Sequence, residues 1–437
     1  MATGAAMVVT GRAALLAAGG AVVVAVAVPS AVGVVAVTAA VLVLCAVDVG
    51  LAGTVGPLGI HRTGDQSVRL GESARISLHV TNQGPRRVRG LLRDAWPPSA
   101  GIESDRVPVD IGSGERRTFE FTLRPTRRGD RMADRVTVRS IGPLGLAGRQ
   151  GFHDVPWRLR VLPPFHSRRH LPSRLDRLRE LDGRAAVMIR GAGTEFDSLR
   201  EYVIGDDTRS IDWRGTARTG EVVVRTWRPE RDRHVLIVLD TGRTSAGRVG
   251  DAPKLDAAMD AALLLAALAT RAGDRVDLLA YDRRVRAAVE RTGPSDVLPK
   301  LVTAMATLEP ELLETDHRRL VAEVLRRAGR HAFVVLLTSL DAGAVEDALL
   351  PVMGLLTHRH TVLIASVTDP AVTAMAAARG DTAAVYGAAA AARDQLGRNR
   401  VSQLLERHRA HVRHATPDEL PPMVADTYLE LKAAGRL

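Results

Sequence analysis

The feature that most restricts the fold is an apolar run near the N-terminus. No charged residue occurs between Ala13 and Val47, and alanine, valine and leucine dominate the run. One membrane-spanning helix needs about 20 residues, so the run is too long for a single span. Pro29-Ser30 divides it into two halves of similar length. We therefore predict two short helices joined by a tight turn, a transmembrane helical hairpin.

A cleavable signal peptide is the alternative, because Arg12 precedes an apolar stretch of suitable length. A second apolar segment follows at once, which favours the hairpin. A hairpin places both of its ends on one side of the membrane. Arg12 and the arginines from Arg62 onward assign that side to the cytoplasm, since basic residues tend to flank the cytoplasmic ends of spans. We predict a multi-pass protein of the cell membrane whose soluble domains face the cytoplasm.

Composition narrows the classes of partner. The net charge of +11 is compatible with nucleic-acid binding. However, the arginines are interleaved with acidic residues, and aromatic residues make up only 3% of the chain, so platforms for stacking bases are scarce. We expect no nucleic-acid partner, and the basic charge fits attraction to an anionic membrane surface. The single cysteine, Cys45, excludes an intramolecular disulfide and a multi-cysteine zinc site.

Residues 62–163 show the alternation that is typical of half-buried strands. Apolar and polar side chains alternate in residues 75–80 and again in residues 118–123. Glycine and proline residues separate such runs as turns. Several short strands with one apolar face predict a small β-sandwich, which would serve as a spacer or an interaction module.

A segment of mixed charge lies at residues 191–229. It contains Phe196, Tyr202, Trp213 and Trp227, although aromatic residues are rare in the chain, and its acids alternate with arginines. Bidentate carboxylate–guanidinium pairs would hold such an irregular segment in one shape and present it to a partner. A solvated, salt-bridged linker is the alternative. The candidate interaction residues are Glu195, Phe196, Arg200, Tyr202, Asp206, Asp207, Arg209, Asp212, Trp213 and Arg218.

The order of these residues resembles the signature of the domain of unknown function 58 family. That signature is a G-x-E-F-x-x-L-R-x-Y-x-x-G-D-D-x-R-x-I-D-W-x-x-x-A-R run, which here begins at Gly193 and ends at Arg218. In the family it precedes a von Willebrand factor type A-like domain. The resemblance implies a bacterial binding protein associated with a MoxR-type AAA+ ATPase, with residues 191–229 helping to build the docking surface.

From residue 231 the apolar pattern changes. Residues 235–239 form the continuous apolar run of a buried parallel strand, and strand-like segments then alternate with helix-like segments up to the C-terminus. The alternation predicts a doubly wound α/β domain, which looks like the von Willebrand factor type A fold. The predicted fold class is thus multidomain, organised as an N-terminal tail (1–12), a transmembrane hairpin (13–55), a β-sandwich (62–163), a linker helix with the signature segment (164–230) and the α/β domain (231–437).

The resemblance also implies a place for a metal ion. The type A fold commonly carries a magnesium site, built by an Asp-x-Ser-x-Ser loop after its first strand, and hard oxygen ligands suit magnesium. Here Asp240 and Thr244 keep an oxygen in the loop, whereas Gly242 has no side chain. Thr315 is a further candidate ligand, and Ser339 stands where a second acid is expected. A degenerate magnesium site of Asp240, Thr244 and Thr315 is the candidate, against a loop that only shapes an interaction surface.

We do not expect an enzyme. The sequence has no Gly-x-Ser-x-Gly elbow and no Walker loop, and histidines with metal-ligand spacing are limited to His358 and His360. The sequence therefore predicts a membrane-anchored adaptor for which magnesium is the only cofactor considered. A magnesium-dependent enzyme and a nucleic-acid-binding protein are the alternative functions.

Overall fold

The computed structural model describes residues 6–27, 29–188, 195–228 and 233–437; within these, the side chains of 182–188, 195–198 and 226–228 lie outside the description. The chain divides into two compact units, Met1–Leu162 and Pro163–Leu437. Each unit has its own sheets and its own hydrophobic core.

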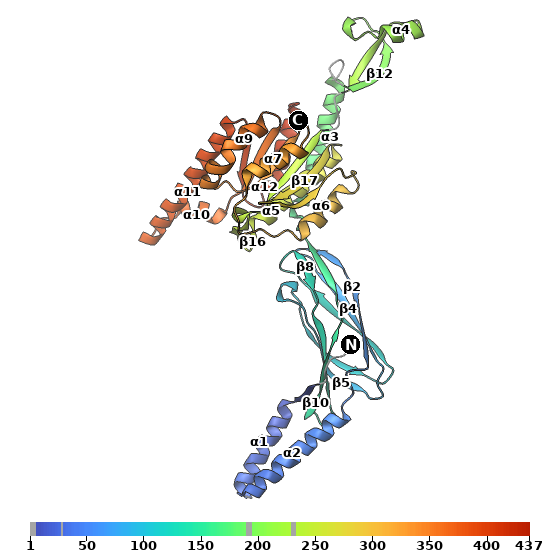
Figure 1. Ribbon diagram of the computed structural model, residues 1–437, viewed down its shortest axis with the longest axis vertical. Coiled ribbons are helices and arrows are strands. Elements are labelled where there is room, and N and C mark those ends of the chain that lie inside the picture. The colour runs from blue at the N-terminus through green and yellow to red at the C-terminus, as the bar shows by residue number, and fades with distance from the viewer. Residues whose placement is uncertain (1–5, 28, 189–194, 229–232) are drawn as a thin grey trace. The chain divides into compact units, whose positions relative to one another are not determined.

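Two helices open the first unit, α1 (Gly11–Ala27) and α2 (Ala31–Leu51) (Figure 1). They lie antiparallel and in contact, so closely that a side chain at Gly20 would collide with Val37. Ser30 caps α2 by accepting a hydrogen bond from the backbone. Among the described residues, α2 is the one helix that is long and apolar enough to cross a membrane. The pair supports the predicted hairpin in part, and its passage through a membrane stays a prediction.

Asp48 joins these helices to the sheet that follows. Its side chain is fully buried in the last turn of α2. One carboxylate oxygen accepts a hydrogen bond from Leu144 N at 2.7 Å, and the other accepts from Leu146 N and Ala147 N at 2.7 and 2.8 Å. The first charge after the apolar run therefore satisfies three backbone donors of a distant loop.

The chain before α1 contacts the same loop. Strand β1 (Ala6–Val9) pairs antiparallel with β10 (Ala147–Asp154), and the Thr10 hydroxyl donates to Gly145 O at 2.6 Å. Both ends of the helix pair are consequently attached to one loop of the β-rich part, which makes helices and sheet a single unit.

Three sheets build the β-rich part. Their orders are β1-β10-β9-β5-β6, β2-β4-β7 and β3-β11-β8, and every pairing is antiparallel except that of β3 with β11. Alternate residues of β4, for example Ile76 and Leu78, face a core shared with the other sheets. The β-sandwich itself stays a prediction. The remaining strands are β2 (Leu58–Gly64), β3 (Ser67–Arg69), β4 (Ala74–Asn82), β5 (Val88–Asp94), β6 (Arg106–Ile111), β7 (Arg116–Leu123), β8 (Gly129–Met132), β9 (Arg135–Ile141) and β11 (Arg158–Leu162), with a 3-10 turn η1 (Pro98–Ala100).

An ion pair lies inside this core. Arg62 and Asp94 are buried and paired, and Trp96 Nε1 donates to the second Asp94 oxygen at 2.8 Å. The Arg62 guanidinium also lies over the Trp96 ring and donates to Val155 O. Burial raises the pKa of Asp94 and lowers that of Arg62, while their mutual attraction opposes both shifts. These contacts fix β2 against β5.

The second unit is built on a six-stranded sheet of order β18-β17-β14-β19-β20-β21. All of its pairings are parallel except that of the edge strand β18. Its elements are η2 (His166–His170), α3 (Leu171–Met188), β12 (Glu195–Glu201), η3 (Thr208–Ser210), α4 (Trp213–Thr219), β13 (Val223–Arg228), β14 (His234–Asp240), η4 (Arg243–Ala246), β15 (Arg248–Val249), β16 (Ala252–Pro253), α5 (Lys254–Arg271), β17 (Arg275–Tyr281), β18 (Val285–Val289), α6 (Val297–Ala306), α7 (His317–Arg327), β19 (Phe333–Leu337), α8 (Ala342–Ala344), the π-helical turn η5 (Val345–Leu349), α9 (Leu350–Thr357), β20 (Thr361–Val367), α10 (Pro370–Ala377), α11 (Thr382–Arg407), β21 (His411–Ala415) and α12 (Leu420–Ala433).

Helices cover the sheet (Figure 1). Leu236 and Val238 of β14 share a core with Leu320 of α7, Met353 of α9 and Leu405 of α11. Side chains alternate along a strand, so the other β14 residues face the opposite side, where α5 contacts both β14 and α12. The chain leaves β14 toward β17 and later returns to β19 on its other flank, which makes the carboxyl ends of β14 and β19 the point where strand order reverses. Open α/β sheets bind ligands at such points.

Buried polar contacts attach the first helices of this unit. Ser167 of η2 donates its backbone N–H and its hydroxyl to Asp260 of α5, the hydroxyl at 2.7 Å. Arg174 of α3 pairs with Asp426 of α12 at 2.7 Å. The linker helix therefore packs onto the α5 and α12 side of the sheet.

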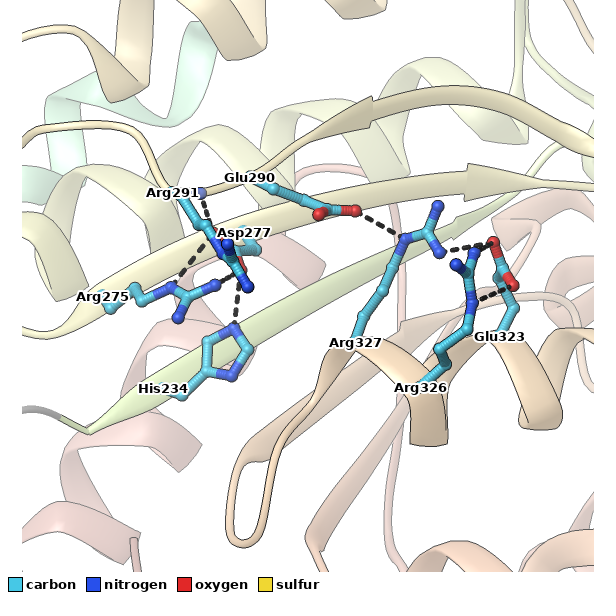
Figure 2. Close-up of polar contacts among 8 residues, drawn as sticks. All are labelled: His234, Arg275, Asp277, Glu290, Arg291, Glu323, Arg326 and Arg327. Atoms are coloured by element: carbon cyan, nitrogen blue, oxygen red, sulfur yellow. Dashed lines mark hydrogen bonds and ion pairs between the residues drawn. The ribbon is translucent and has the colours of Figure 1, made fainter.

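The amino ends of the strands carry a second polar cluster, centred on Asp277 (Figure 2). His234 lies 2.9 Å from Asp277, which also accepts from the Arg275 side chain and from Arg291 N. Burial opposes ionisation of Asp277, yet these hydrogen bonds hold its pKa below the ordinary value. Arg291 has a left-handed φ of 49°, which turns its N–H toward the carboxylate.

Beside this cluster, Arg327 connects β18 to α7. Its guanidinium pairs with Glu290 at 2.7 Å and with Glu323, which also pairs with Arg326 (Figure 2). Arg327 and Glu323 are largely shielded from solvent, so these pairs are less screened than ordinary surface pairs.

His360 is buried directly before the amino end of β20. Neither ring nitrogen has a hydrogen-bond partner within the described part of the chain. Burial lowers its pKa, and the positive charges of His331, Arg359 and His234 lower it further. His358 is exposed, so the two histidines at metal-ligand spacing occupy different environments.

The first prediction concerns Asp48. Asp48→Ala removes the acceptor of three hydrogen bonds, and we expect it to lower the free energy of unfolding of the first unit by about 2–4 kcal/mol, because the donors stay buried. Thermal denaturation of the full-length protein in detergent measures the loss. Asp65→Ala is the matched control, since exposed Asp65 accepts one bond, from Arg75 N. Equal melting temperatures for the two variants would contradict the role of Asp48.

The second prediction concerns pH. The folded-state pKa of His360 lies below the unfolded value of about 6.5, so its stabilising contribution is complete above that pH and is lost as the pH falls through the folded value. We expect the melting temperature to fall with acidification below about pH 6.5, and His360→Leu to reduce that slope. His358→Leu, which changes an exposed histidine two residues away, should leave the slope unchanged. An unaltered slope in His360→Leu would refute the assignment.

Candidate functional sites

The signature segment folds into an antiparallel pair of β12 and β13 with η3 and α4 between them. Tyr202 N donates to Val222 O at 2.8 Å and continues the pairing. Gly215 lies so close to Val223 and Leu199 that a side chain there would collide with both. The prediction of an irregular segment is therefore wrong, because strand pairing across the inserted helix leaves no simple alternation in the local sequence.

Asp212 organises the helix inside this hairpin. One carboxylate oxygen accepts from Arg214 N and Gly215 N, both at 2.9 Å, and caps α4. The other accepts from Arg225 Nε of β13 at 2.8 Å. The hydrogen bonds from Gly215 N and Arg225 hold the pKa of Asp212 below its ordinary value. One side chain therefore connects the start of α4 to the returning strand.

Asp206 organises the turn after β12. It accepts from Arg200 at 2.6 Å and from Val203 N at 2.9 Å. Asp207 accepts from Arg209 N at 2.9 Å. Backbone N–H groups thus donate many of the hydrogen bonds that were predicted to come from bidentate guanidinium groups. They can do so because an aspartate side chain is short and reaches the backbone of its own loop.

The hairpin exposes large apolar side chains. Ile204 is 96% exposed, Trp213 70% and Val203 61%. They lie in the turn after β12 and at the start of α4, the two places fixed by Asp206 and Asp212. Apolar groups held in one conformation and left exposed are typical of a binding surface.

The predicted interaction residues divide by environment. Asp207, Arg209, Trp213 and Arg218 are exposed, and Arg200, Tyr202, Asp206 and Asp212 are partly buried. Glu195 and Phe196 belong to β12, but their side chains lie outside the described residues.

The second candidate site is Asp240, at the carboxyl end of β14. Its side chain is buried, and one oxygen accepts from Gly242 N at 2.8 Å and from the Thr315 hydroxyl at 2.5 Å. The other oxygen accepts from the Thr338 hydroxyl at 2.5 Å. Three loops, those after β14, before α7 and after β19, meet at this carboxylate.

The threonine pattern differs from the sequence expectation. Thr338 contacts Asp240, whereas the Ser339 hydroxyl donates to Thr244 O at 3.2 Å. Thr244 is therefore held by its carbonyl group. Arg243, in the same loop, is exposed and pairs with Glu314 at 2.6 Å. Residues in a turn change direction at every position, so spacing alone could not show which hydroxyl faces Asp240.

This geometry does not fit the predicted magnesium ligand set. The Thr315 hydroxyl occupies the space into which a side chain at Gly242 would extend, and both Asp240 oxygens already accept hydrogen bonds. Within the described ranges, no group of three or more His, Cys, Asp or Glu side chains is arranged to hold a metal ion. A divalent ion would therefore have to displace the hydroxyl donors from Asp240 in order to bind there.

His317 lies near Asp240. It is buried at the start of α7, and its Nδ1 has no hydrogen-bond partner in the described structure. Burial lowers its pKa, although Asp240 and other nearby acids oppose the shift. A nucleophile–base pair would need a hydroxyl bonded to the imidazole, but the hydroxyls of Thr315 and Thr338 donate to Asp240.

The third prediction concerns the hairpin. We expect Asp212→Ala to accelerate amide hydrogen exchange across residues 213–219, because α4 loses its cap and its link to Arg225. Asp207→Ala is the control, since it removes a single bond to Arg209 N. If both variants exchange like the unmodified protein, Asp212 does not hold the helix.

Comparison with known sequences identifies the region around these sites. A family model described as "Protein of unknown function DUF58" matches residues 198–398. Uncharacterized proteins of Mycobacterium bovis and of two strains of Mycobacterium tuberculosis are 27% identical over 191 residues, which make up 44% of this chain. The chain spans 60% of the length of these relatives.

Solved structures show only distant likeness. The CARDB domain of the PF1109 protein from Pyrococcus furiosus matches 25% of this chain and 94% of that domain, at 17% identity and a TM-score of 0.18. A β-glucuronidase of Bacteroides uniformis matches 82% of this chain and 33% of that one, at 10% identity and a TM-score of 0.17. Neither likeness carries an argument. Residues 198–398, which include most of the signature hairpin and the whole Asp240 site, are a DUF58 family domain.

Proposed function

We propose that the chain is a membrane-anchored adaptor that binds a partner protein and is not itself an enzyme. The observation that carries the proposal is that the signature hairpin exposes three large apolar side chains, those of Val203, Ile204 and Trp213. Tryptophan is prominent among residues that dominate binding energy when they enter a partner's pocket. Asp206 and Asp212 hold this surface in one shape before binding.

Preorganisation supports this function. A binding surface that is ordered in advance loses little conformational entropy on association. The Asp240 site supports the part of the proposal that concerns catalysis. Its hydroxyls and carboxylate form hydrogen bonds with one another, so neither hydroxyl at this site is activated as a nucleophile.

The helix pair is the proposed anchor. At 17 residues, α1 is within the lower range of spanning helices, and α2 is longer and mostly exposed within the protein. Two spans would return the chain to the side on which it began, and the arginines of the first unit favour the cytoplasm. The β-rich part, as a β-sandwich, would then follow the anchor in the chain and precede the second unit.

The proposed partner is a MoxR-type AAA+ ATPase. This part of the proposal rests on the family resemblance of the signature, together with the α/β architecture, which agrees with a von Willebrand factor type A-like domain. The ATPase would supply the nucleotide chemistry, and the adaptor would supply the docking surface.

The fourth prediction tests the docking surface. Full-length protein in detergent is immobilised and its affinity for the purified ATPase is measured with ADP and with a non-hydrolysable ATP analogue. We expect Trp213→Ala to weaken binding about tenfold or more, as loss of a buried aromatic anchor predicts.

Tyr386→Ala is the matched control, because Tyr386 is a similarly exposed aromatic residue on α11. Its affinity should equal that of the unmodified protein. Absence of binding under every nucleotide condition would refute the ATPase as partner, and equal loss in both variants would refute the hairpin as docking surface.

A further inference from the structure

Hydrogen bonds hold together the loops that meet around Asp240. The loop before α7 attaches to the loops after β14 and β17 through three backbone hydrogen bonds. These run from Glu311 N to Thr241 O, from Arg243 N to Leu313 O and from Asp316 N to Asp282 O, at 2.8 to 2.9 Å. Thr315 adds the bond to Asp240, and Thr338 brings in the loop after β19.

The carboxylate at the centre has no cationic partner. Asp240 is 1% exposed and forms no ion pair with any residue that the structure describes. Its charge is stabilised by two hydroxyl donors and one backbone N–H. Hydrogen bonds to a buried charge are strong, because no water competes for the acceptor.

The glycine in this loop is part of the arrangement. A side chain at Gly242 would occupy the position of the Thr315 hydroxyl, so the hydroxyl can reach Asp240 only because residue 242 has none. Gly242 lacks the side chain that could have been a metal ligand, and for the same reason it leaves room for a hydrogen-bond donor to Asp240.

We infer that the hydroxyls of Thr315 and Thr338 form a latch on Asp240. This hydroxyl latch holds the loops at the carboxyl ends of β14 and β19 in place, as a metal ion would, so that their shape requires no divalent cation. The latch joins three loops at the point where strand order reverses. Its geometry is independent of the docking proposal, and it holds whether or not the hairpin binds an ATPase.

The latch is tested by removing its donors. In full-length protein, Thr315→Val and Thr338→Val keep the side-chain shape and delete the hydroxyl. We expect amide exchange in residues 309–316 and 338–341 to accelerate about tenfold or more, as loss of a bond to a buried charge predicts. The acceleration should be equal in EDTA and in magnesium chloride. Thr303→Val, which removes an exposed hydroxyl on α6, is the control, and Thr315→Ser and Thr338→Ser should restore slow exchange.

A second variant separates the latch from a metal site. Thr338→Asp would face Asp240 with another carboxylate, and we expect its melting temperature to fall in EDTA and to recover with magnesium chloride. The unmodified protein should melt at the same temperature in both solutions. Magnesium binding to the unmodified protein by calorimetry, lost in Asp240→Asn, would overturn the inference. Unchanged exchange in both valine variants would overturn it as well.

Discussion

The structure depends on aspartate carboxylates that are buried where separate segments of the chain meet. A buried carboxylate is costly unless its oxygens accept hydrogen bonds, so each one fixes the position of the donors around it. The hydrophobic cores of the two units consist largely of alanine, valine and leucine, and such side chains can pack in several arrangements. Satisfied polar contacts select one of them. The residues that act in this way include Asp48, Asp94, Asp240, Asp260, Asp274 and Asp277.

Buried aspartates have different partners at the amino ends and at the carboxyl ends of the strands in the six-stranded sheet. At the amino edge Asp277 is surrounded by His234 and Arg275, so that its charge is balanced. At the carboxyl ends of the strands, buried Asp240 accepts instead from two neutral hydroxyls, and His317 lies nearby. Open α/β sheets bind ligands at the carboxyl ends of their strands, and at that place in this sheet the donors to Asp240 are two hydroxyls and one backbone N–H.

Part of the regular structure could be predicted from the sequence, because a continuous apolar run marks a buried parallel strand. The run at residues 235–239 lies within β14. Helix α7 was not predicted, because it is rich in arginine and buries only one narrow face. Contacts across the fold were also out of reach. The residues next to Asp48 in the sequence do not show that its oxygens accept hydrogen bonds from residues 144–147. The sequence also does not show that Thr338, and not the neighbouring Ser339, donates to Asp240.

The signature hairpin shows why residues that resemble a family motif need not all contact a partner. A two-stranded hairpin is marginally stable by itself, so part of the motif must maintain its shape. Asp212 does so through a helix cap, and Gly215 does so through its close approach to the side chains of Val223 and Leu199. Trp213 lies between them and is exposed. In the proposed complex, loss of the tryptophan would remove contact area, whereas loss of the aspartate would weaken binding through the entropy of ordering the surface, so the two substitutions would change the heat of binding differently.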